Sequence, residues 1–200
     1  EKSLRLALGK DESALTNADE RLMWATMHAG AVGRFKDSLQ ITKMDAVTTN
    51  VVAASGLNID LAKVLKAAKL LAKGNAPDSK VNIAIHANQV EALLAIERFS
   101  SSDYFTHSLV TGKVDGFMGM NWIVFGDSTV GGLPITNNIR SCFAWIDQAI
   151  GVVSKYETLA KVWFSDEQFS YMADSFVEEG CSVLDEKGVV KILCDETNVT

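Results

Sequence analysis

The fold is decided by residues 58–124, which end in the segment KVDGFMGMNWIV at positions 113–124. The stretch begins NIDLAKVLKAAKLLAKG, in which apolar residues recur at helical spacing and Gly74 follows as a stop. Apolar residues then alternate with polar or small ones over 81–85, which is typical of a strand. The stretch therefore predicts a helix and strand packed together, and it carries no nucleophile motif, metal cluster or phosphate-binding loop.

Two asparagines are expected to begin the helices of this stretch. Asn58 precedes the long helical stripe, and Asn88 precedes a shorter one that carries Val90 and Leu93. Asn side chains accept hydrogen bonds from the free amides of a first helical turn. A further strand is expected over 118–125.

A loop rich in Gly, Asn and Thr follows at 126–138. Its length and composition are typical of a flexible surface loop that contacts other molecules. We therefore expect it at a subunit contact if the chain assembles.

The chain before residue 58 predicts one long helix. Asn17 and Glu20 form a capping-box pattern, and apolar side chains then recur every three or four residues. A helix over about residues 18–46 would span roughly 40 Å at 1.5 Å per residue, enough to cross a molecule of this size. The predicted buried stripe is Trp24, Met27, Ala31, Phe35 and Leu39.

Several segments outside the predicted helices are expected to be strands or extended connectors. Residues 4–8 alternate as a strand does, and 47–56 form a connector or a strand. Further strands are expected at 141–146 and 156–164. Residues 168–179 fit a helix or a strand equally well by periodicity.

A hairpin is expected near the C-terminus. Residues 181–184 and 189–193 are apolar enough to be strands, and they flank the turn sequence Asp-Glu-Lys-Gly at 185–188. Taken together the elements predict a mixed α+β chain without regular βαβ alternation.

Composition narrows the functional classes. Of 200 residues, 48% are apolar and 22% charged, which is ordinary for a folded chain of one domain or two small ones. No stretch reaches the roughly 18 to 20 uncharged apolar residues of a spanning helix. The net charge is −6 with no run of Lys or Arg, which argues against tight direct nucleic-acid binding. Cys142, Cys181 and Cys194 lack zinc or disulfide spacing and are expected to be reduced thiols.

The residues that might carry chemistry do not converge. His28, His86 and His107 lie on three different predicted elements, so structural or surface roles are expected for all three. His86 lacks the accompanying nucleophile elbow of a hydrolase. Gly112-Lys113 lacks the rest of a phosphate-binding loop, and the glycines at 30 and 33 lie within a helical pattern.

Acidic pairs and tryptophans favour structural roles as well. The pairs Asp166-Glu167, Glu178-Glu179 and Asp185-Glu186 are expected on the solvated surface, since adjacent carboxylates in turns rarely act as general acids and bases. The tryptophans fall within apolar patterns and are expected to be core or interface anchors; they are Trp24, Trp122, Trp145 and Trp163.

Several short motifs, in this order, resemble the Hong Kong 97-like major capsid proteins of tailed phages. They are Gly33-Arg34 with Asp37 in the predicted long helix, Ser102-Asp103-Tyr104, Gly112-Lys113-Val114, and Gly116-Phe117 with Gly119. The resemblance covers nearly the whole chain as an order of elements, and it is most specific in the middle.

The resemblance implies an α+β, Hong Kong 97-like capsid fold with a long spine helix, a peripheral-domain sheet and an apical domain. Residues 1–15 would be a remnant of the arm and extended loop, most of which would precede residue 1. Residues 16–56 and 165–200 would form the peripheral domain, with 168–179 as a long strand beside the spine helix. Residues 57–164 would form the apical domain, so the C-terminal hairpin is expected outside it.

The resemblance also implies a function. The chain would be a structural subunit of a tailed-bacteriophage capsid, self-assembling into hexamers and pentamers of an icosahedral shell that encloses double-stranded DNA without sequence-specific binding. Its partners would be further copies of itself and the scaffolding and portal proteins. No membrane contact would be expected. It would be found in the virion after assembly in the bacterial cytoplasm.

The scattered histidines, the unpaired acidic groups and the missing phosphate-binding loops lead us to expect no catalytic residue, cofactor or metal site, and a chain that is not an enzyme. Two alternatives stay open. One is a soluble α+β enzyme or ligand-binding protein, which converging polar groups in a pocket would favour. The other is a subunit of a non-viral, encapsulin-like protein shell.

Overall fold

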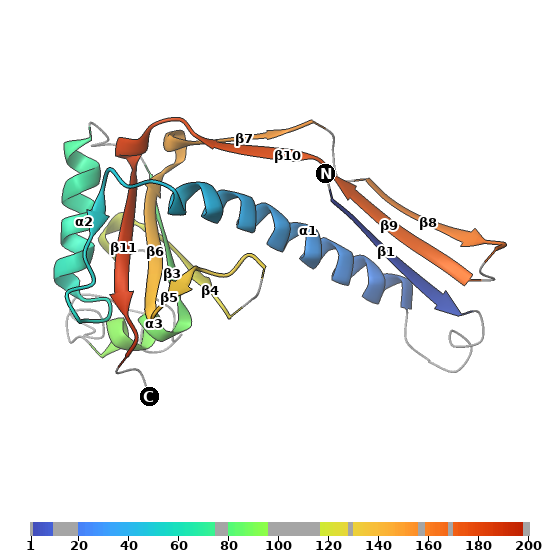
Figure 1. The fold of residues 1–200 in the computed structure, drawn as a ribbon, viewed down its shortest axis with the longest axis horizontal. Helices are drawn as coiled ribbons and strands as arrows, with labels where there is room; N and C mark the ends of the chain where they lie inside the picture. The colour runs from blue at the N-terminus through green and yellow to red at the C-terminus, as the bar shows by residue number, and fades with distance from the viewer. Residues whose placement is uncertain are drawn as a thin grey trace.

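The molecule consists of a compact lobe and a long limb (Figure 1). The computed structural model describes residues 2–9, 20–74, 80–95, 117–127, 130–155, 159–167 and 170–197. The compact lobe comprises the described residues of 51–149 and 186–195. The limb comprises a long helix, a two-stranded ribbon and a separate three-stranded sheet. A single chain therefore builds one globular body and one extended projection.

The compact lobe contains most of the short elements. They are β2 (Val51–Val52), α2 (Leu61–Lys73), β3 (Val81–His86), α3 (Ala87–Leu94), β4 (Asn121–Phe125), β5 (Ile135–Thr136), β6 (Ile139–Ile146) and β11 (Val189–Asp195), with 3-10 turns at Phe117–Gly119, Asp147–Ala149 and Glu186–Gly188. The main sheet has the order β2-β11-β6-β3-β4, and β5 pairs with β6. β3 and β4 are parallel, whereas β6 is antiparallel to both β3 and β11.

The lobe has a dry core at the centre of this sheet. β6 is buried or nearly so along its length, and Phe143 is fully enclosed. Val64 and Leu71 of α2 and Leu93 of α3 join the same cluster. The strands expected at 81–85 and 141–146 are confirmed as β3 and β6. The strand expected over 118–125 begins only at Asn121, because residues 117–119 form a 3-10 turn.

The limb is built from one helix and five strands. They are β1 (Lys2–Gly9), α1 (Glu20–Asp45), β7 (Ile150–Ser154), β8 (Leu159–Ser165), β9 (Ser170–Val177) and β10 (Glu179–Val183). β9 pairs antiparallel with β1 and β8, and β10 pairs antiparallel with β7. Residues 170–177 are thus a strand, as the family resemblance implied, and it contacts α1.

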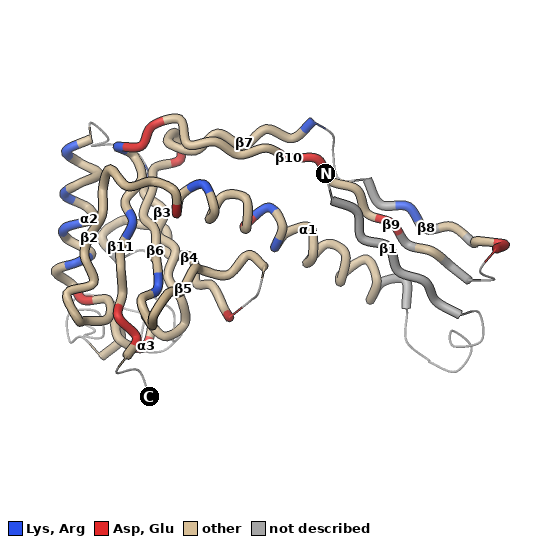
Figure 2. Tube along the Cα trace, in the orientation of Figure 1, with Lys and Arg blue, Asp and Glu red and all other residues tan. Residues whose placement is uncertain are grey.

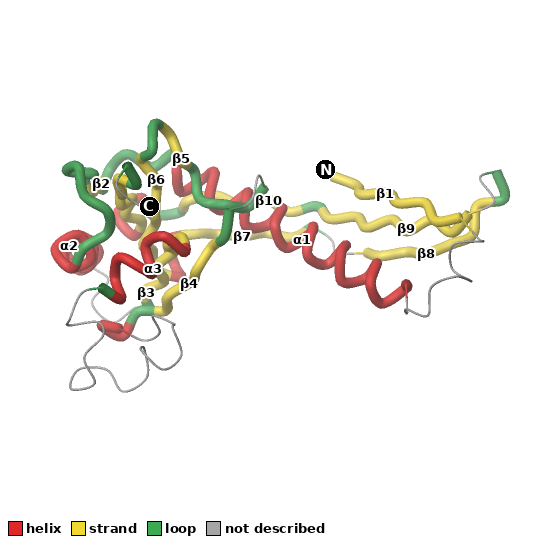
Figure 3. Tube along the Cα trace, turned by 90° about the horizontal axis from the view of Figure 1, so that it is seen from below, coloured by secondary structure: helices red, strands yellow, loops and turns green. Residues whose placement is uncertain are grey.

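The long helix α1 connects the two parts of the molecule, as Figure 3 shows from below. It is continuous through Gly30 and Gly33, which confirms a single helix within the expected range; residues 11–19, with the expected cap, lie outside the described part. Three contacts fix it: His28 Nδ1 to Ser175 Oγ at 2.9 Å, Lys36 Nζ to Glu179 Oε2 at 3.0 Å, and Asp45 Oδ1 to Lys191 Nζ at 2.6 Å. A polar side-chain contact therefore joins α1 to each of the three neighbouring parts, which are the distal sheet, the ribbon and the lobe.

The expected single buried stripe on α1 is wrong. Met27 is 54% exposed, while the buried side chains are Trp24 and His28 near one end and Ile41 and Met44 near the other. At 3.6 residues per turn these two pairs point about 150° apart around the helix. The helix contacts different bodies at its two ends, so no single stripe describes its burial.

The expected helix caps are displaced. Asp60, rather than Asn58, caps α2, and its side chain accepts a hydrogen bond from Lys63 N at 2.7 Å. His86, rather than Asn88, caps α3, and Gln89 Oε1 accepts a hydrogen bond from the His86 amide at 3.1 Å. Asn58 instead accepts a hydrogen bond from the Gln89 side chain at 3.1 Å. Short polar residues near a helix start compete for the cap, and the backbone geometry decides between them.

Gly74 ends α2 as expected, although for a different reason. Its φ of −77° is one that any residue adopts. A Cβ at this position would lie 2.9 Å from the Lys187 carbonyl oxygen. Close approach of the backbone preceding β11 therefore requires glycine here.

The predicted C-terminal hairpin is wrong. β10 pairs with β7 in the limb, whereas β11 pairs with β6 and β2 in the lobe. The intervening residues 186–188 form a 3-10 turn that carries the chain from one body to the other.

The expected division of the chain is corrected in the same way. β11 lies inside the main sheet, not outside the lobe, while β7 and β8 leave the lobe before residue 164. Strand pairing of this kind joins residues far apart in sequence, so local periodicity does not report it.

The loop expected at 126–138 ends in a tight hairpin rather than a flexible tip. Asn137 and Asn138 have φ of 52° and 61° and form the two-residue turn between β5 and β6. Two successive positive φ values are typical of a type I′ turn. Gly131 lies against α1, since a Cβ there would be 2.6 Å from the Arg34 carbonyl oxygen. Lysine substitutions at the two asparagines would therefore strain the hairpin.

Candidate functional site: assembly surfaces

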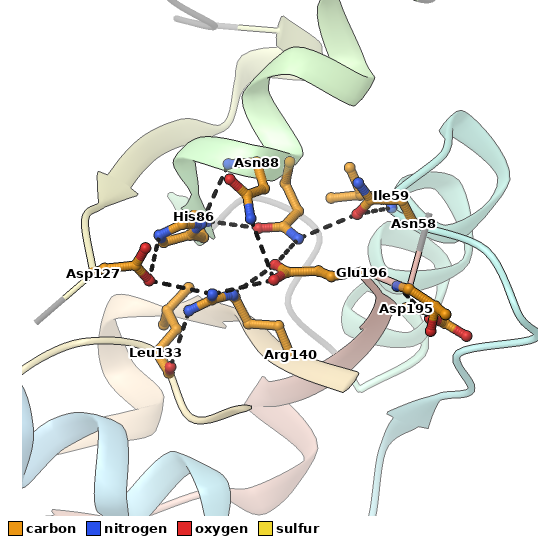
Figure 4. A network of polar contacts seen from close by, with 11 residues as sticks. Asn58, Ile59, His86, Asn88, Asp127, Leu133, Arg140, Asp195 and Glu196 are labelled. Carbon is orange, nitrogen blue, oxygen red and sulfur yellow. Dashed lines mark hydrogen bonds and ion pairs between the residues drawn. The ribbon is translucent and has the colours of Figure 1, made fainter. Parts of the chain in front are cut away.

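A polar network closes one edge of the compact lobe (Figure 4). Its centre is Arg140 of β6 and Glu196, which follows β11. Arg140 Nε donates to Glu196 Oε1 at 2.6 Å, and Nη2 donates to Oε2 at 3.1 Å. Both side chains are 7% exposed, so this two-point ion pair is nearly desolvated. It fixes the C-terminal segment to the sheet.

The same carboxylate receives donors from α3. Gln89 Nε2 donates to Glu196 Oε1 at 2.7 Å, and Asn88 Nδ2 donates to Oε2 at 3.3 Å. Burial acts to raise the pKa of Glu196, but the hydrogen bonds from Arg140 and Gln89 and the charge of Arg140 outweigh it and leave the pKa below its ordinary value. Glu196 is therefore held ionised, which suits a structural anchor and not a general acid.

Asp127 extends the network to the beginning of the segment that leads to β5. Its Oδ1 lies 3.3 Å from Arg140 Nη2 and 3.1 Å from His86 Nε2. His86 Nδ1 accepts a hydrogen bond from the Asn88 amide at 3.2 Å, which leaves Nε2 to carry the proton facing Asp127. Because the Asp127 side chain is 80% exposed, this contact is a modest tether.

The histidines named from the sequence are not brought together. His28 is buried between α1 and β9, and His86 is buried at the start of α3. His107 lies outside the described residues. Within the part of the chain that the structure describes, no group of three His, Cys, Asp or Glu side chains is arranged to hold a metal ion.

Two of the three cysteines are buried within the main sheet. Cys142 and Cys194 lie on the paired strands β6 and β11 and are fully enclosed. The neighbouring Cys194 thiol, followed by burial, raises the pKa of Cys142 well above its ordinary value. Cys181 is half-buried on β10, where burial raises its pKa too. Neutral thiols are poor nucleophiles, so Cys142 and Cys181 fit structural roles.

The acidic pairs named from the sequence differ in their exposure to solvent. Asp166 and Glu167 are exposed, as expected. Glu179 is an exception, because its side chain is only 5% exposed and pairs with Lys36 of α1. Its partner in sequence, Glu178, pairs with Lys155 across the ribbon at 3.1 Å. No local pattern distinguishes Glu179 from Glu178, because the difference depends on where α1 crosses the ribbon.

The tryptophans anchor both parts of the molecule. Trp122 and Trp145 belong to the lobe core, and Trp24 is buried near the distal end of α1. Trp163 of β8 is half-buried, with Lys161 Nζ 5.6 Å from its ring centroid. Core or anchor roles are therefore confirmed for the first three.

The limb exposes apolar side chains. Met23 and Met27 are adjacent on one face of α1 and are 52% and 54% exposed. On the ribbon side, Val153 is 71% and Leu184 70% exposed. Single exposed apolar residues are ordinary, but several along a thin projection favour contacts with other molecules.

These surfaces, and not the polar network, are the candidate functional features. In the network, Glu196 accepts hydrogen bonds from Arg140, Gln89 and Asn88, so this carboxylate serves to hold the fold together. The geometry instead offers a rigid lobe, a stiff connecting helix and an apolar limb. No helix in the described residues is long and apolar enough to cross a membrane.

Comparison with protein families identifies one model. The family described as phage capsid protein matches residues 6–196, nearly the whole chain. A search of curated proteins finds no match.

Solved structures show the same fold at low sequence identity. One is a structure described as Mycobacterium phage Che8, with a TM-score of 0.71 and 17% identity over 96% of this chain and 69% of that chain. The head structure of Helicobacter pylori bacteriophage KHP40 gives 0.68 and 13% over 97% and 73%. An encapsulin complex from Synechococcus elongatus gives 0.65 and 11% over 100% and 76%.

Proposed function

Because the chain belongs to the phage capsid protein family and is a structural subunit of a bacteriophage capsid, we propose that it assembles into hexamers and pentamers of an icosahedral shell. The observation that carries the proposal is the family match over residues 6–196. The limb supports it, since a thin projection with exposed Met27 and Val153 has too little core of its own and gains stability by contact with neighbouring copies.

Heterologous contacts between identical subunits close into rings when the rotation between them permits it. Each contact in such a ring can be weak, because simultaneous contacts to several neighbours multiply the overall affinity. The stiff helix α1 supports this geometry by holding the lobe and the distal sheet at a fixed separation.

The two parts of the molecule correspond, in this proposal, to the two domains of a capsid subunit. The compact lobe is the apical domain, now including β11, and the limb with α1 is the peripheral domain. Strand β1 belongs to the limb in this proposal, and its pairing with β9 supports that assignment.

The expected partners follow from the same role. Self-association builds the shell and makes the chain a virion component. Scaffolding and portal proteins, packaged double-stranded DNA and assembly in the host cytoplasm belong to the proposal. So does the absence of enzymatic activity, which the structural character of the capsid family supports.

Sedimentation and negative-stain microscopy of the full-length protein test the proposal. Closed rings or shells are expected at high concentration with scaffolding protein present. A protein that stays strictly monomeric under those conditions would refute the capsid function.

A non-viral shell is the second candidate, favoured by the similar fold of the Synechococcus elongatus encapsulin. Contents discriminate between the two. Particles purified from the native source should hold double-stranded DNA if the shell is viral, and a folded cargo protein without DNA if it is not.

A further inference from the structure

One helix of the compact lobe carries a concentrated positive charge. α2 has the sequence LAKVLKAAKLLAK, with four lysines and no acidic residue, in a chain of net charge −6. Figure 2 shows this basic residue series along the helix at the end of the lobe farthest from the limb. The sequence contains no consecutive run of basic residues, so the concentration is visible only once the helix is formed.

The four lysines are used in two ways. Lys63 is buried, and its Nζ donates to the carbonyl oxygens of Ala54 at 2.7 Å, Leu57 at 2.5 Å and Leu193 at 3.0 Å. It therefore serves the fold. Lys66, Lys69 and Lys73 are exposed, and at 100° per residue they lie within about 60° of one another around the helix.

The three exposed lysines differ from other lysines of the described residues in their ion pairing. In the part of the chain that the structure describes, none of them forms an ion pair, although Lys36, Lys155 and Lys191 do. Like charges three or four residues apart destabilise a helix by a few tenths of a kcal/mol per pair. The helix C-terminus favours Lys73 but not Lys66 in the middle. A partner outside the chain would offset this repulsion.

We propose that the face formed by Lys66, Lys69 and Lys73, the lysine face, contacts the phosphate backbone of double-stranded DNA without reading its sequence. This inference rests on the proposed capsid function, since only a DNA-filled shell presents the duplex to many copies at once. Three lysines bind weakly alone, and the number of subunits multiplies the contact.

A second copy of this chain fits the lysine face less well than DNA does. Among the described residues, the exposed carboxylates of Asp147, Asp185 and Glu186 lie near one another, because the 3-10 turns 147–149 and 186–188 are in contact. A second copy would therefore offer the lysine face one small acidic cluster. Duplex DNA carries one negative charge per about 1.7 Å of its axis, so it offers negative charge along the whole lysine face.

The test measures binding of the unassembled, dilute chain to a labelled random-sequence duplex of about 30 base pairs as salt rises from about 50 to 200 mM. Three neutralised phosphates give a log–log slope of about −2.7, which is about a 40-fold loss over that range. The variant Lys66→Gln/Lys69→Gln/Lys73→Gln is expected to lose most of the binding and of the slope. The matched control Lys43→Gln/Lys155→Gln/Lys161→Gln changes net charge equally and is expected to retain both.

Sedimentation of the same proteins under assembly conditions separates the alternatives. Shells from the lysine-face variant, with DNA binding lost, are the expected result. Equal DNA binding by wild type and variant, equal loss in the control, or no binding by wild type would each overturn the inference. Loss of shell formation by the variant in the absence of DNA would assign the face to a subunit contact instead. Failure of the wild type to form shells would refute the capsid function, and this inference with it.

Discussion

The compact lobe and the limb are made by the same chain but held together differently. The lobe surrounds Phe143, Ile83 and Ile192 with a continuous apolar core. The limb has few fully buried side chains among its described residues and relies on separate polar contacts along α1, such as His28 with Ser175. We infer from this contrast that the lobe has enough core to be stable alone. The limb is expected to gain stability from contacts with neighbouring copies.

The largest effect should come from the core of the lobe. Phe143→Ala removes a fully buried ring and should lower the free energy of unfolding by about 4 kcal/mol. Urea denaturation measures it. Met172→Ala on β9 is the matched limb variant and should cost clearly less; an equal cost would break the proposed contrast between the two parts.

Breaking the buried ion pair should have the next largest effect. Glu196→Gln leaves the buried Arg140 with only the exposed Asp127 carboxylate as counter-charge, at a cost of about 3 kcal/mol at pH 7. Because the pKa of Glu196 is lowered in the folded state, its stabilisation is present above about pH 4.3, the ordinary glutamate value, and is lost as pH falls through the folded pKa. Wild type and variant should therefore converge in urea midpoint as the pH falls from about 4.3 through the folded pKa of Glu196. A constant difference at all pH values would contradict the assignment.

The contrast itself can be measured by amide hydrogen exchange. Amides of β6 and β11 should exchange only through global unfolding, while those of the β7–β10 ribbon should open at a free energy lower by about 2 kcal/mol or more. Assembly should raise protection in the ribbon and leave β6 unchanged. Uniform protection across both parts in the unassembled chain would show that they form one cooperative unit.

A smaller effect should come from the contact between the lobe and the middle of α1. Gly131→Ala places a Cβ at positive φ and 2.6 Å from the Arg34 carbonyl oxygen, which should cost about 2 kcal/mol. Thermal unfolding measures this loss. Gly126→Ala is the control, since a Cβ there meets nothing within 4 Å. Equal melting temperatures for the two variants would show that the backbone at residue 131 does not pack against α1.

The smallest effect is expected at the exposed pair on the ribbon. Lys155→Ala removes a partner of Glu178 that is 62% exposed, and should change stability by less than about 0.5 kcal/mol. Denaturation in low and high salt checks this value. A loss above 1 kcal/mol would mean that the ribbon carries more of the limb's stability than its exposure indicates.

Local patterns were sufficient wherever a segment's environment was uniform. The helix at 61–73 was predicted because one face meets the sheet and the other meets water, and the strands at 81–86 and 139–146 alternate or are wholly apolar for similar reasons. The prediction of a single buried stripe on α1 is wrong because the helix packs against the limb sheet on one side and against the lobe on another. The family motifs at 102–116 lie outside the described residues, so the family match, and not the structure, supports them.

The α+β class, the long helix, most strands and the resemblance to the capsid family could be inferred from local patterns and the order of short motifs. Hydrophobic period and turn residues act over a few positions, so they are visible in the sequence. Three features appear only in the folded molecule: β11 joins the lobe, Arg140 contacts Glu196 from 56 residues away, and three lysines lie on one exposed helix face. Such contacts depend on where the chain returns, which is set by the burial of the whole core rather than by any local pattern.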